Sequence, residues 1–213
     1  MADSLPLIAL IPAAGKSSRM GAPKLLLDLY GKSILECVLE SLQHPSINDV
    51  AVLVRAEDLA ISAVLHQLPG RVLIYRSAQP TLDMRASVTC LVEQLRGQHA
   101  GGWLLIPPDT LGVDQSVLER MLTAAAAEPG QIIVPVHQGQ RGHPTIFPQT
   151  LAEDLSGIPE DNGLNWLLRS RPDRVVEVDC PEESVLWNIN SPPEWQQLLR
   201  QAETLRRKPA VPD

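Results

Sequence analysis

The sequence predicts an α/β fold, in which a single domain is built on a doubly wound, mostly parallel sheet with helices on both faces. Short apolar runs at residues 7–11, 50–55, 72–75, 103–106 and 132–136 alternate with segments whose apolar residues have helical spacing. Within the runs, consecutive positions are apolar, which is typical of strands covered on both sides. Strands that alternate with helices in this way favour a parallel sheet with helical crossovers.

The helical segments are expected at residues 33–43, 57–68, 84–95 and 116–127. Ser33 and Glu36 have the spacing of a capping box, in which each side chain bonds the backbone N–H of the other residue, so they predict a helix start. Beyond residue 136 the pattern is less regular. We expect loops with short helices over residues 137–151 and 156–170, strands near 175–178 and 185–189, and a final amphipathic helix over 191–207.

Length and composition indicate one domain over residues 1–207 and a loose tail at 208–213. The chain has 213 residues, 44% of them hydrophobic, which is enough for one sizeable core. The net charge of -7 leaves no basic surface of the kind that binds nucleic acid. No apolar run reaches the length of a membrane span, so we expect no membrane partner.

The cysteines indicate a reducing compartment. Cys37, Cys90 and Cys180 lie far apart and match no metal or redox spacing, so we expect buried, reduced thiols in a cytoplasmic protein. The apolar N-terminal stretch does not predict a signal peptide, because Asp3 stands where a basic region is required.

The stretch IPAAGKSSRMGAPKLLL, residues 11–27, places small residues and positive charge directly behind the first predicted strand. In open α/β sheets ligands bind at the carboxyl ends of the strands. Small residues let backbone N–H groups approach phosphate oxygens, and arginine or lysine side chains neutralise them. The stretch therefore predicts a phosphate site, to which we assign Pro12, Ala13, Ala14, Gly15, Lys16, Arg19 and Lys24. The similar-looking Gly31–Ser33 is not a P-loop, because Leu26 stands where its first glycine is required.

Asp109 is the second chemical candidate. It follows a predicted strand and two prolines, and it is expected at the same edge of the sheet as the phosphate site. A lone carboxylate in such a place can simply cap a turn. Beside a nucleoside triphosphate it becomes a natural ligand for Mg²⁺, which prefers one or two carboxylates together with phosphate oxygens.

The first motif, PAAGKSSRMGAPK, resembles the L-A-A-G-x-S-x-R-M-G-x-x-K signature of nucleotidyltransferases with a GT-A-type, Rossmann-like fold. Three further segments occur in the family's order: LLIPPDT, GQRGHPTIF and DNGLNWLLR. The chain is most similar to the molybdenum cofactor cytidylyltransferases. The resemblance implies an Mg²⁺-dependent enzyme that transfers CMP from CTP to the terminal phosphate of molybdopterin, with a molybdenum hydroxylase as the recipient of the product.

The resemblance also implies roles for particular residues. Arg19, Lys24 and Asp109 would be catalytic, and Ser87 would join the phosphate loop in binding the nucleotide. Metal would be held by Asp109 and Asn190. The acceptor would be bound by Arg141, Gly142, His143 and Pro144.

Some residues depart from the cytidylyltransferase pattern. Asn188 and Asn190 replace two aspartates near the end of the chain and resemble the guanylyltransferase relatives instead. The PAAG form of the loop favours CTP, because the Ala14 methyl group is expected to narrow the space beside the base. Three alternatives remain: transfer from GTP to molybdopterin, transfer to a sugar phosphate or methylerythritol phosphate, and a non-catalytic accessory protein that delivers the cofactor to a hydroxylase.

Overall fold

The computed structural model describes residues 6–15, 23–68, 70–78, 83–111 and 113–207, and the side chains of the last helix as far as Arg200. The predictions for Lys16, Arg19 and the tail at 208–213 lie outside the described residues.

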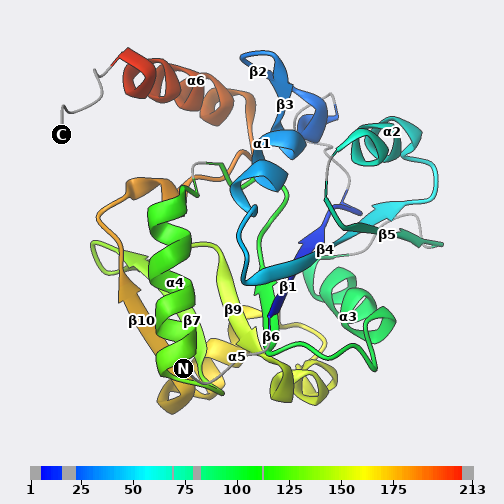
Figure 1. Cartoon of the computed structure of the whole chain (residues 1–213), viewed down its shortest axis with the longest axis vertical. Helices are drawn as coiled ribbons and strands as arrows, with labels where there is room; N and C mark the ends of the chain where they lie inside the picture. Colours follow the sequence, from blue (N-terminus) through cyan, green and yellow to red (C-terminus); the bar gives the residue numbers. More distant parts are fainter. Residues whose placement is uncertain (1–5, 16–22, 69, 79–82, 112, 208–213) are drawn as a thin grey trace.

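A mixed sheet forms the centre of the molecule (Figure 1). Within the described residues it has eight strands in the order β10-β7-β9-β6-β1-β4-β5, and β8 pairs with β7. The pairs β1–β4, β1–β6, β4–β5 and β7–β10 are parallel, which confirms the predicted mostly parallel sheet. The strands are β1 (Leu7–Pro12), β4 (Ile47–Arg55), β5 (Val72–Ser77), β6 (Gly102–Leu105), β7 (Ile132–His137), β8 (Gln140–Arg141), β9 (Thr145–Pro148) and β10 (Val175–Asp179).

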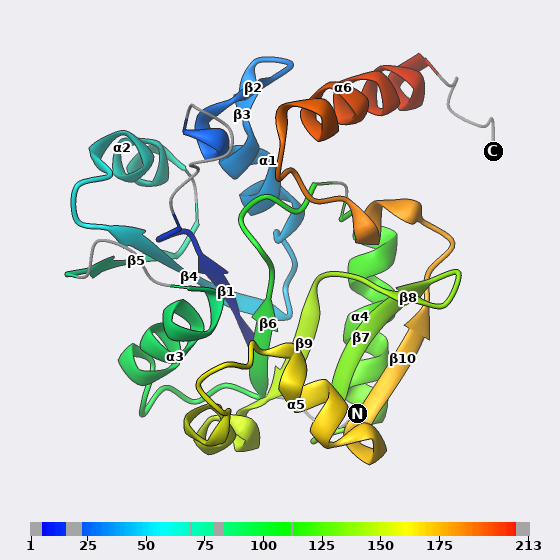
Figure 2. The same ribbon diagram turned by 180° about the vertical axis from the view of Figure 1, so that it is seen from behind.

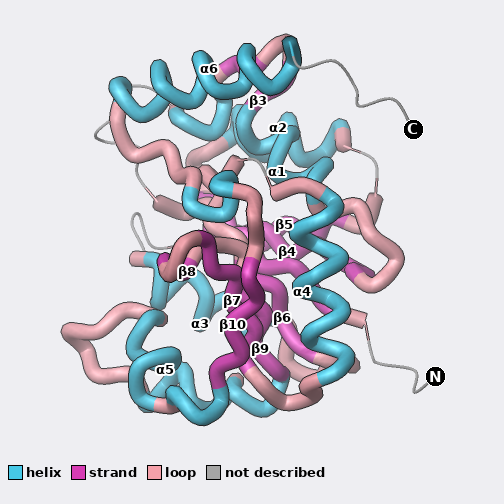
Figure 3. The backbone as a smooth tube through the Cα atoms, turned by 90° about the vertical axis from the view of Figure 1, so that its left-hand side faces the viewer, coloured by secondary structure: helices cyan, strands magenta, loops and turns pink. Residues whose placement is uncertain are grey.

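Helices cover both faces of this sheet, as Figure 3 shows. Alternate residues of β1 point to opposite faces, so that Ile11 belongs to one apolar cluster and Leu10 to the other. The cluster with Ile11 is closed by α1 (Ile34–Ser41), α2 (Leu59–Gln67) and α4 (Gln115–Ala127). The cluster with Leu10 is closed by α3 (Met84–Gln94) and α5 (Asn165–Ser170).

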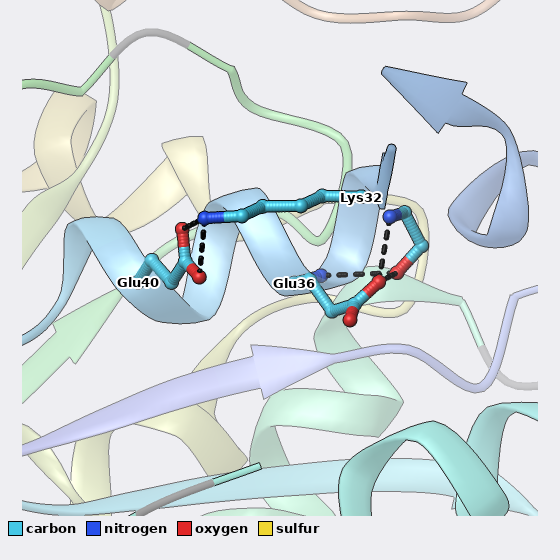
Figure 4. A network of polar contacts seen from close by, with 4 residues as sticks. Lys32, Glu36 and Glu40 are labelled. Atoms are coloured by element: carbon cyan, nitrogen blue, oxygen red, sulfur yellow. Dashed lines mark hydrogen bonds and ion pairs between the residues drawn. The ribbon is translucent and has the colours of Figure 1, made fainter. Parts of the chain in front are cut away.

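Local capping fixes where the helices begin. The Glu36 carboxylate accepts a hydrogen bond from the Ser33 N–H at 2.6 Å, and the Ser33 hydroxyl accepts one from the Glu36 N–H at 3.3 Å (Figure 4). This confirms the predicted capping box at α1. Asp83 and Asp114 cap α3 and α4 in the same way through a side-chain oxygen.

The segment after β7 differs from the prediction of loops with short helices. Residues 140–141 form β8, and residues 145–148 form β9, which runs antiparallel between β6 and β7. Thr145–Pro148 is too short to show a clear strand periodicity and ends in a proline. It forms a strand because its backbone pairs with β6 on one side and β7 on the other. This pairing outweighs the weak strand propensity of the four residues.

The strand predicted at 185–189 was also wrong. Residues Glu183–Leu186 form a short 3-10 helix, and Asn188 makes a single antiparallel bridge with Thr110. The Val185 carbonyl oxygen accepts a hydrogen bond from the His143 N–H at 2.8 Å. The Val185 carbonyl oxygen is thus bonded to the turn at His143 and not to a neighbouring strand. The segment buries Val185 and Ile189 without becoming a strand of the sheet.

The last helix, α6 (Pro192–Arg207), lies beside the small hairpin of β2 (Asp28–Leu29) and β3 (Lys32–Ser33). Its Leu198 is buried in the core, and the Tyr30 hydroxyl donates to the Leu199 carbonyl oxygen at 3.2 Å. Among the helices described, none is both long and apolar enough to cross a membrane.

Gly102 provides a test of the β6–β9 pairing. A Cβ atom at this position would collide with the Phe147 carbonyl oxygen of the neighbouring strand. We therefore expect Gly102→Ala to lower the free energy of unfolding by about 1–3 kcal/mol, measured by urea denaturation. Gly157→Ala is the matched control, because an added Cβ there meets no atom within 4 Å. Equal stability of the two variants would contradict the close approach of β9.

Candidate active site

A cleft of about 330 Å³ opens at the carboxyl ends of β1 and β6. We call it the first cleft. Open α/β sheets bind ligands at this edge. The first cleft is lined by Pro12, Ala13, Gly15, Lys24, Leu25, Met84, Pro107, Pro108, Asp109, His143, Asn188 and Asn190. It therefore collects residues from the phosphate loop, the end of β6, the turn before β9 and the segment before α6.

An ion pair joins the two predicted catalytic residues in the first cleft. The Lys24 Nζ lies 2.6 Å from the Asp109 Oδ2 and donates a second hydrogen bond to the Ile189 carbonyl oxygen at 2.8 Å. The side chains of Lys24 and Asp109 are only 17% and 10% exposed. Partial burial weakens screening by solvent, so this pair interacts more strongly than one on the open surface.

Asp109 is held in place by the backbone on both sides. Two prolines precede it, and its carbonyl oxygen accepts a hydrogen bond from the Ile189 N–H at 3.3 Å. The Thr110 hydroxyl donates to the Asn188 Oδ1 at 2.8 Å. Residues near 109 and near 189 thus lie side by side, where the chain leading into α6 passes the loop that follows β6 (Figure 2).

The first cleft contains some, but not all, of the oxygen ligands that a hard cation such as Mg²⁺ requires. No group of three or more histidine, cysteine or acidic side chains that could hold a metal occurs in the described part of the chain. Asp109 supplies one carboxylate, and Asn188 and Asn190 line the same cleft with amide groups. This set fits Mg²⁺ that keeps several waters and binds phosphate oxygens, and it does not form an all-protein cage.

His143 stands where the first cleft meets a neighbouring one. Burial lowers the pKa of its imidazole below the usual value of 6.5, and the Asp109 carboxylate opposes this shift. The ring is therefore neutral at pH 7. Its Nδ1 atom is buried and has no hydrogen-bond partner among the described residues.

The turn that carries His143 is fixed against the chain after β10. The Gly142 Cα packs against the Val185 carbonyl group, where a Cβ atom would collide, and the His143–Pro144 peptide bond is cis. Gly142 and Pro144 are buried and line neither cleft. They shape the turn.

Arg141 does not join this group. It lies on β8, its side chain is exposed, and its Nε donates to the Glu177 carboxylate on β10 at 2.8 Å. Of the four predicted acceptor residues, the structure brings only His143 to the clefts. The physical reason is the strand register, which pairs Arg141 with Val136 and directs it toward the edge of the sheet.

Two predicted nucleotide contacts lie away from the first cleft. Ser87 is in the first turn of α3 and is almost fully buried. Ala14 is fully buried in the apolar cluster that contains Leu10. Its methyl group does not line the cleft and cannot narrow the space beside a base, which corrects the physical argument for CTP.

The neighbouring cleft, which we call the second cleft, was not predicted. It measures about 360 Å³ and shares Met84, Pro107 and His143 with the first cleft. Its other lining residues are Leu105, Thr145, Phe147, Gly163, Leu164, Asn165, Leu168 and Arg169. The sequence signals for this cleft are the segments GQRGHPTIF and DNGLNWLLR, which contain most of its lining residues.

Two larger hollows, of about 570 and 510 Å³, adjoin His44 at the opposite edge of the sheet. They lie near the amino ends of β1, β4 and β5 and contain none of the predicted site residues. The His44 Nε2 lies 3.0 Å from the Glu119 carboxylate, and its Nδ1 accepts the Ser46 N–H. These contacts give His44 a structural role.

Similarity to known proteins agrees with this geometry. The chain is 31% identical over 210 residues to a molybdenum cofactor guanylyltransferase from Rhizobium meliloti, covering 92% of this chain and 89% of that protein. It is 23% identical over 196 residues to nicotine blue oxidoreductase from Paenarthrobacter nicotinovorans, covering 88% of this chain and 93% of that protein.

Among solved structures, a nucleotidyl transferase from Methanothermobacter superposes with a TM-score of 0.78 at 20% identity, over 95% of this chain and 99% of that one. This likeness shows the Rossmann-like nucleotidyltransferase fold. The model of the MobA-like NTP transferase domain matches residues 9–175. With that match over most of its length, the chain belongs to the MobA-like NTP transferase domain family.

Proposed function

We propose that this protein is an enzyme that transfers CMP from CTP to the terminal phosphate of a molybdopterin-type cofactor. The observation that carries the proposal is the Lys24–Asp109 pair, with 2.6 Å between Nζ and Oδ2, inside a cleft at the carboxyl ends of β1 and β6. A cation beside a carboxylate at this edge suits a substrate that brings both phosphate charge and a divalent metal ion.

In the proposed reaction, an oxygen of the acceptor phosphate attacks the α-phosphorus of CTP. The new P–O bond forms as the bond to the β-phosphate breaks, and pyrophosphate leaves with the electron pair. The attacking oxygen is already an anion at neutral pH, so no general base is required. Catalysis then depends on positioning the two substrates and neutralising charge.

The first cleft supplies these requirements. The backbone near Ala13 and Gly15 would contact the nucleotide, and Lys24 would stabilise charge on the α-phosphate. We keep Lys16 and Arg19 as proposed ligands of the phosphates, and Ser87 as a proposed contact that would require a movement of α3. Asp109 and Asn190 would hold Mg²⁺, whose chemistry is to neutralise the triphosphate oxygens.

The ion pair in the ligand-free protein has a consequence for the order of binding. Lys24 already neutralises Asp109, so a free metal ion must displace an ammonium group to reach that carboxylate. A triphosphate offers Lys24 another anion and offers the metal further oxygen ligands. We therefore infer that metal and nucleotide bind together.

GTP is a second candidate donor. The guanylyltransferase from Rhizobium meliloti matches nearly the whole chain, and Asn188 and Asn190 resemble the guanylyl relatives. The form of the PAAG loop supports CTP, now without a role for the Ala14 side chain. We propose a cytoplasmic location, in keeping with three free cysteines, and a molybdenum hydroxylase as the recipient.

The decisive experiment measures pyrophosphate release by the purified protein with each of the four NTPs, with and without molybdenum cofactor. We expect release that requires the cofactor and is fastest with CTP. Faster release with GTP would reassign the donor. Release that requires a sugar phosphate or methylerythritol phosphate would reassign the acceptor. No release with any NTP would contradict an enzyme of this class and favour the accessory role.

Lys24→Ala tests the catalytic cation. We expect turnover to fall at least about tenfold, because a charge directed at the transition state contributes more than one kcal/mol. Lys32→Ala is the matched control, since Lys32 forms an exposed pair with Glu40 away from the first cleft. If Lys24→Ala kept its full kcat, Lys24 would have no catalytic role.

The metal site is tested by titrating Mn²⁺ or Mg²⁺ in a calorimeter, with and without CTP. Asp109→Ala should abolish transfer. Without nucleotide, we expect the wild type to bind metal poorly, and both Asn190→Asp and Lys24→Ala to bind it more tightly, because the first adds a carboxylate and the second frees one.

Gln43→Glu is the control for added negative charge, because Gln43 lies at the opposite edge of the sheet. Full activity in Asp109→Ala would refute the metal assignment. An unchanged affinity in Asn190→Asp would remove Asn190 from the site, and an unchanged affinity in Lys24→Ala would show that the ion pair does not compete with the metal.

A further inference from the structure

Asn188 lines the first cleft, and its side-chain oxygen is bonded to a buried hydroxyl group. The Thr110 Oγ1 atom donates to the Asn188 Oδ1 atom at 2.8 Å, and Thr110 is only 1% exposed. The two residues also form an antiparallel bridge, so their backbones keep the two side chains side by side. The Asn188 oxygen therefore points toward Thr110.

The opposite orientation of the amide would leave a buried donor without a partner. A side-chain amide has an acceptor oxygen and a donor NH₂ group, while a hydroxyl group has a single proton to donate. If the NH₂ group faced Thr110, the hydroxyl proton would need another acceptor. Within the described residues this hydroxyl group makes no other hydrogen bond. Because an unpaired buried donor is costly, the hydroxyl group of Thr110 selects one orientation of the Asn188 amide.

The NH₂ group of Asn188 is the part of this side chain that remains for a ligand. It donates to no residue in the described part of the chain, and it is not one of the buried polar atoms without a partner, so it is accessible at the cleft. The Lys24 ammonium group donates to the carbonyl oxygen of the next residue, Ile189. Of its three N–H groups, Asp109 and Ile189 accept two among the described residues. A charged and a neutral donor thus serve one cleft, which suits an anion.

We propose that Asn188 binds a phosphate oxygen of the substrate through its NH₂ group, and that Thr110 is the positioning residue that fixes this orientation. This inference rests on the proposed function and gives different roles to two nearby asparagines. The Asn190 backbone N–H donates to the Glu194 carboxylate at 2.6 Å, and the Asn190 side chain makes no hydrogen bond with the residues that the structure describes. Asn190 can therefore turn its oxygen to the metal ion, whereas Asn188 presents a donor to the anion.

The test compares binding of inorganic pyrophosphate, the proposed product, with and without a metal ion. Calorimetric titration in EDTA measures the anion contacts alone, and the gain in affinity when Mn²⁺ replaces EDTA measures the metal contacts. We expect Asn188→Ala to weaken binding in EDTA at least about tenfold, because a hydrogen bond to a charged group is lost, and to keep the wild-type gain from Mn²⁺. Asn190→Ala is the matched control, with wild-type affinity in EDTA and a smaller gain from Mn²⁺.

Thr110→Val and Thr110→Ser test the positioning role. Valine is similar in shape to threonine but has no hydroxyl group, so the Asn188 amide is free to turn over. We expect weaker binding of pyrophosphate in EDTA and an unchanged gain from Mn²⁺. Serine keeps the hydroxyl group and should restore the wild-type affinity. Urea denaturation of each variant separates this effect from a loss of stability.

Pyrophosphate binding that depends on Asn188 and Thr110, in a protein that releases no pyrophosphate from any NTP, would uphold this inference and refute the proposed function. Three results would overturn the inference: no binding of pyrophosphate by the wild type in EDTA, equal affinity of Asn188→Ala and the wild type, or a loss in Asn188→Ala that is confined to the gain from Mn²⁺. The last result would make Asn188 a metal ligand. In a protein that transfers nucleotide, any of the three would leave the proposed function standing.

Discussion

The ion pair between Lys24 and Asp109 is the interaction on which the candidate active site depends. Lys24 Nζ contacts both Asp109 and the carbonyl oxygen of Ile189, so one ammonium group joins segments that are 85 and 165 residues away along the chain. This meeting is possible because β1 and β6 are adjacent and parallel, which brings their carboxyl ends to one edge. The sheet topology creates the site, and the ion pair fixes its internal arrangement before any substrate is bound.

Much of the fold could be predicted from the sequence because its signals are local. Consecutive apolar positions indicated the central strands, and Ser33 with Glu36 indicated the start of α1 through contacts three residues apart. Thr145–Pro148 and Glu183–Leu186 could not be assigned in this way, since their conformations depend on partners from distant segments. For β9 these partners are the backbones of β6 and β7, and for Val185 the partner is the turn at His143.

In the candidate site, too, some residues could be predicted from the sequence and others depend on contacts between distant segments. Lys24 and Asp109 were found because the ends of parallel strands meet, which is a property of the fold class. Ala14 and Arg141 do not line the first cleft: Ala14, just after β1, packs into the apolar cluster, and Arg141 is directed away by its pairing with Val136. Ala13 and Ala14 follow the end of β1 and are both buried, but only Ala13 also lines the first cleft. Most of the second cleft's lining comes from two segments quoted above, GQRGHPTIF and DNGLNWLLR, but the sequence alone does not show that they meet, because they lie on β9 and α5.

The two clefts divide the chemistry between them. The first contains the Lys24–Asp109 ion pair, while the second has an apolar floor and Arg169 as its one charged lining residue among those described. His143 lies between them, and because burial lowers its pKa the imidazole adds no fixed charge at pH 7. In the proposed function the residues of the first cleft carry the reaction, so the lining of the neighbouring cleft can vary without altering the Lys24–Asp109 pair, in keeping with a fold that hosts many functions.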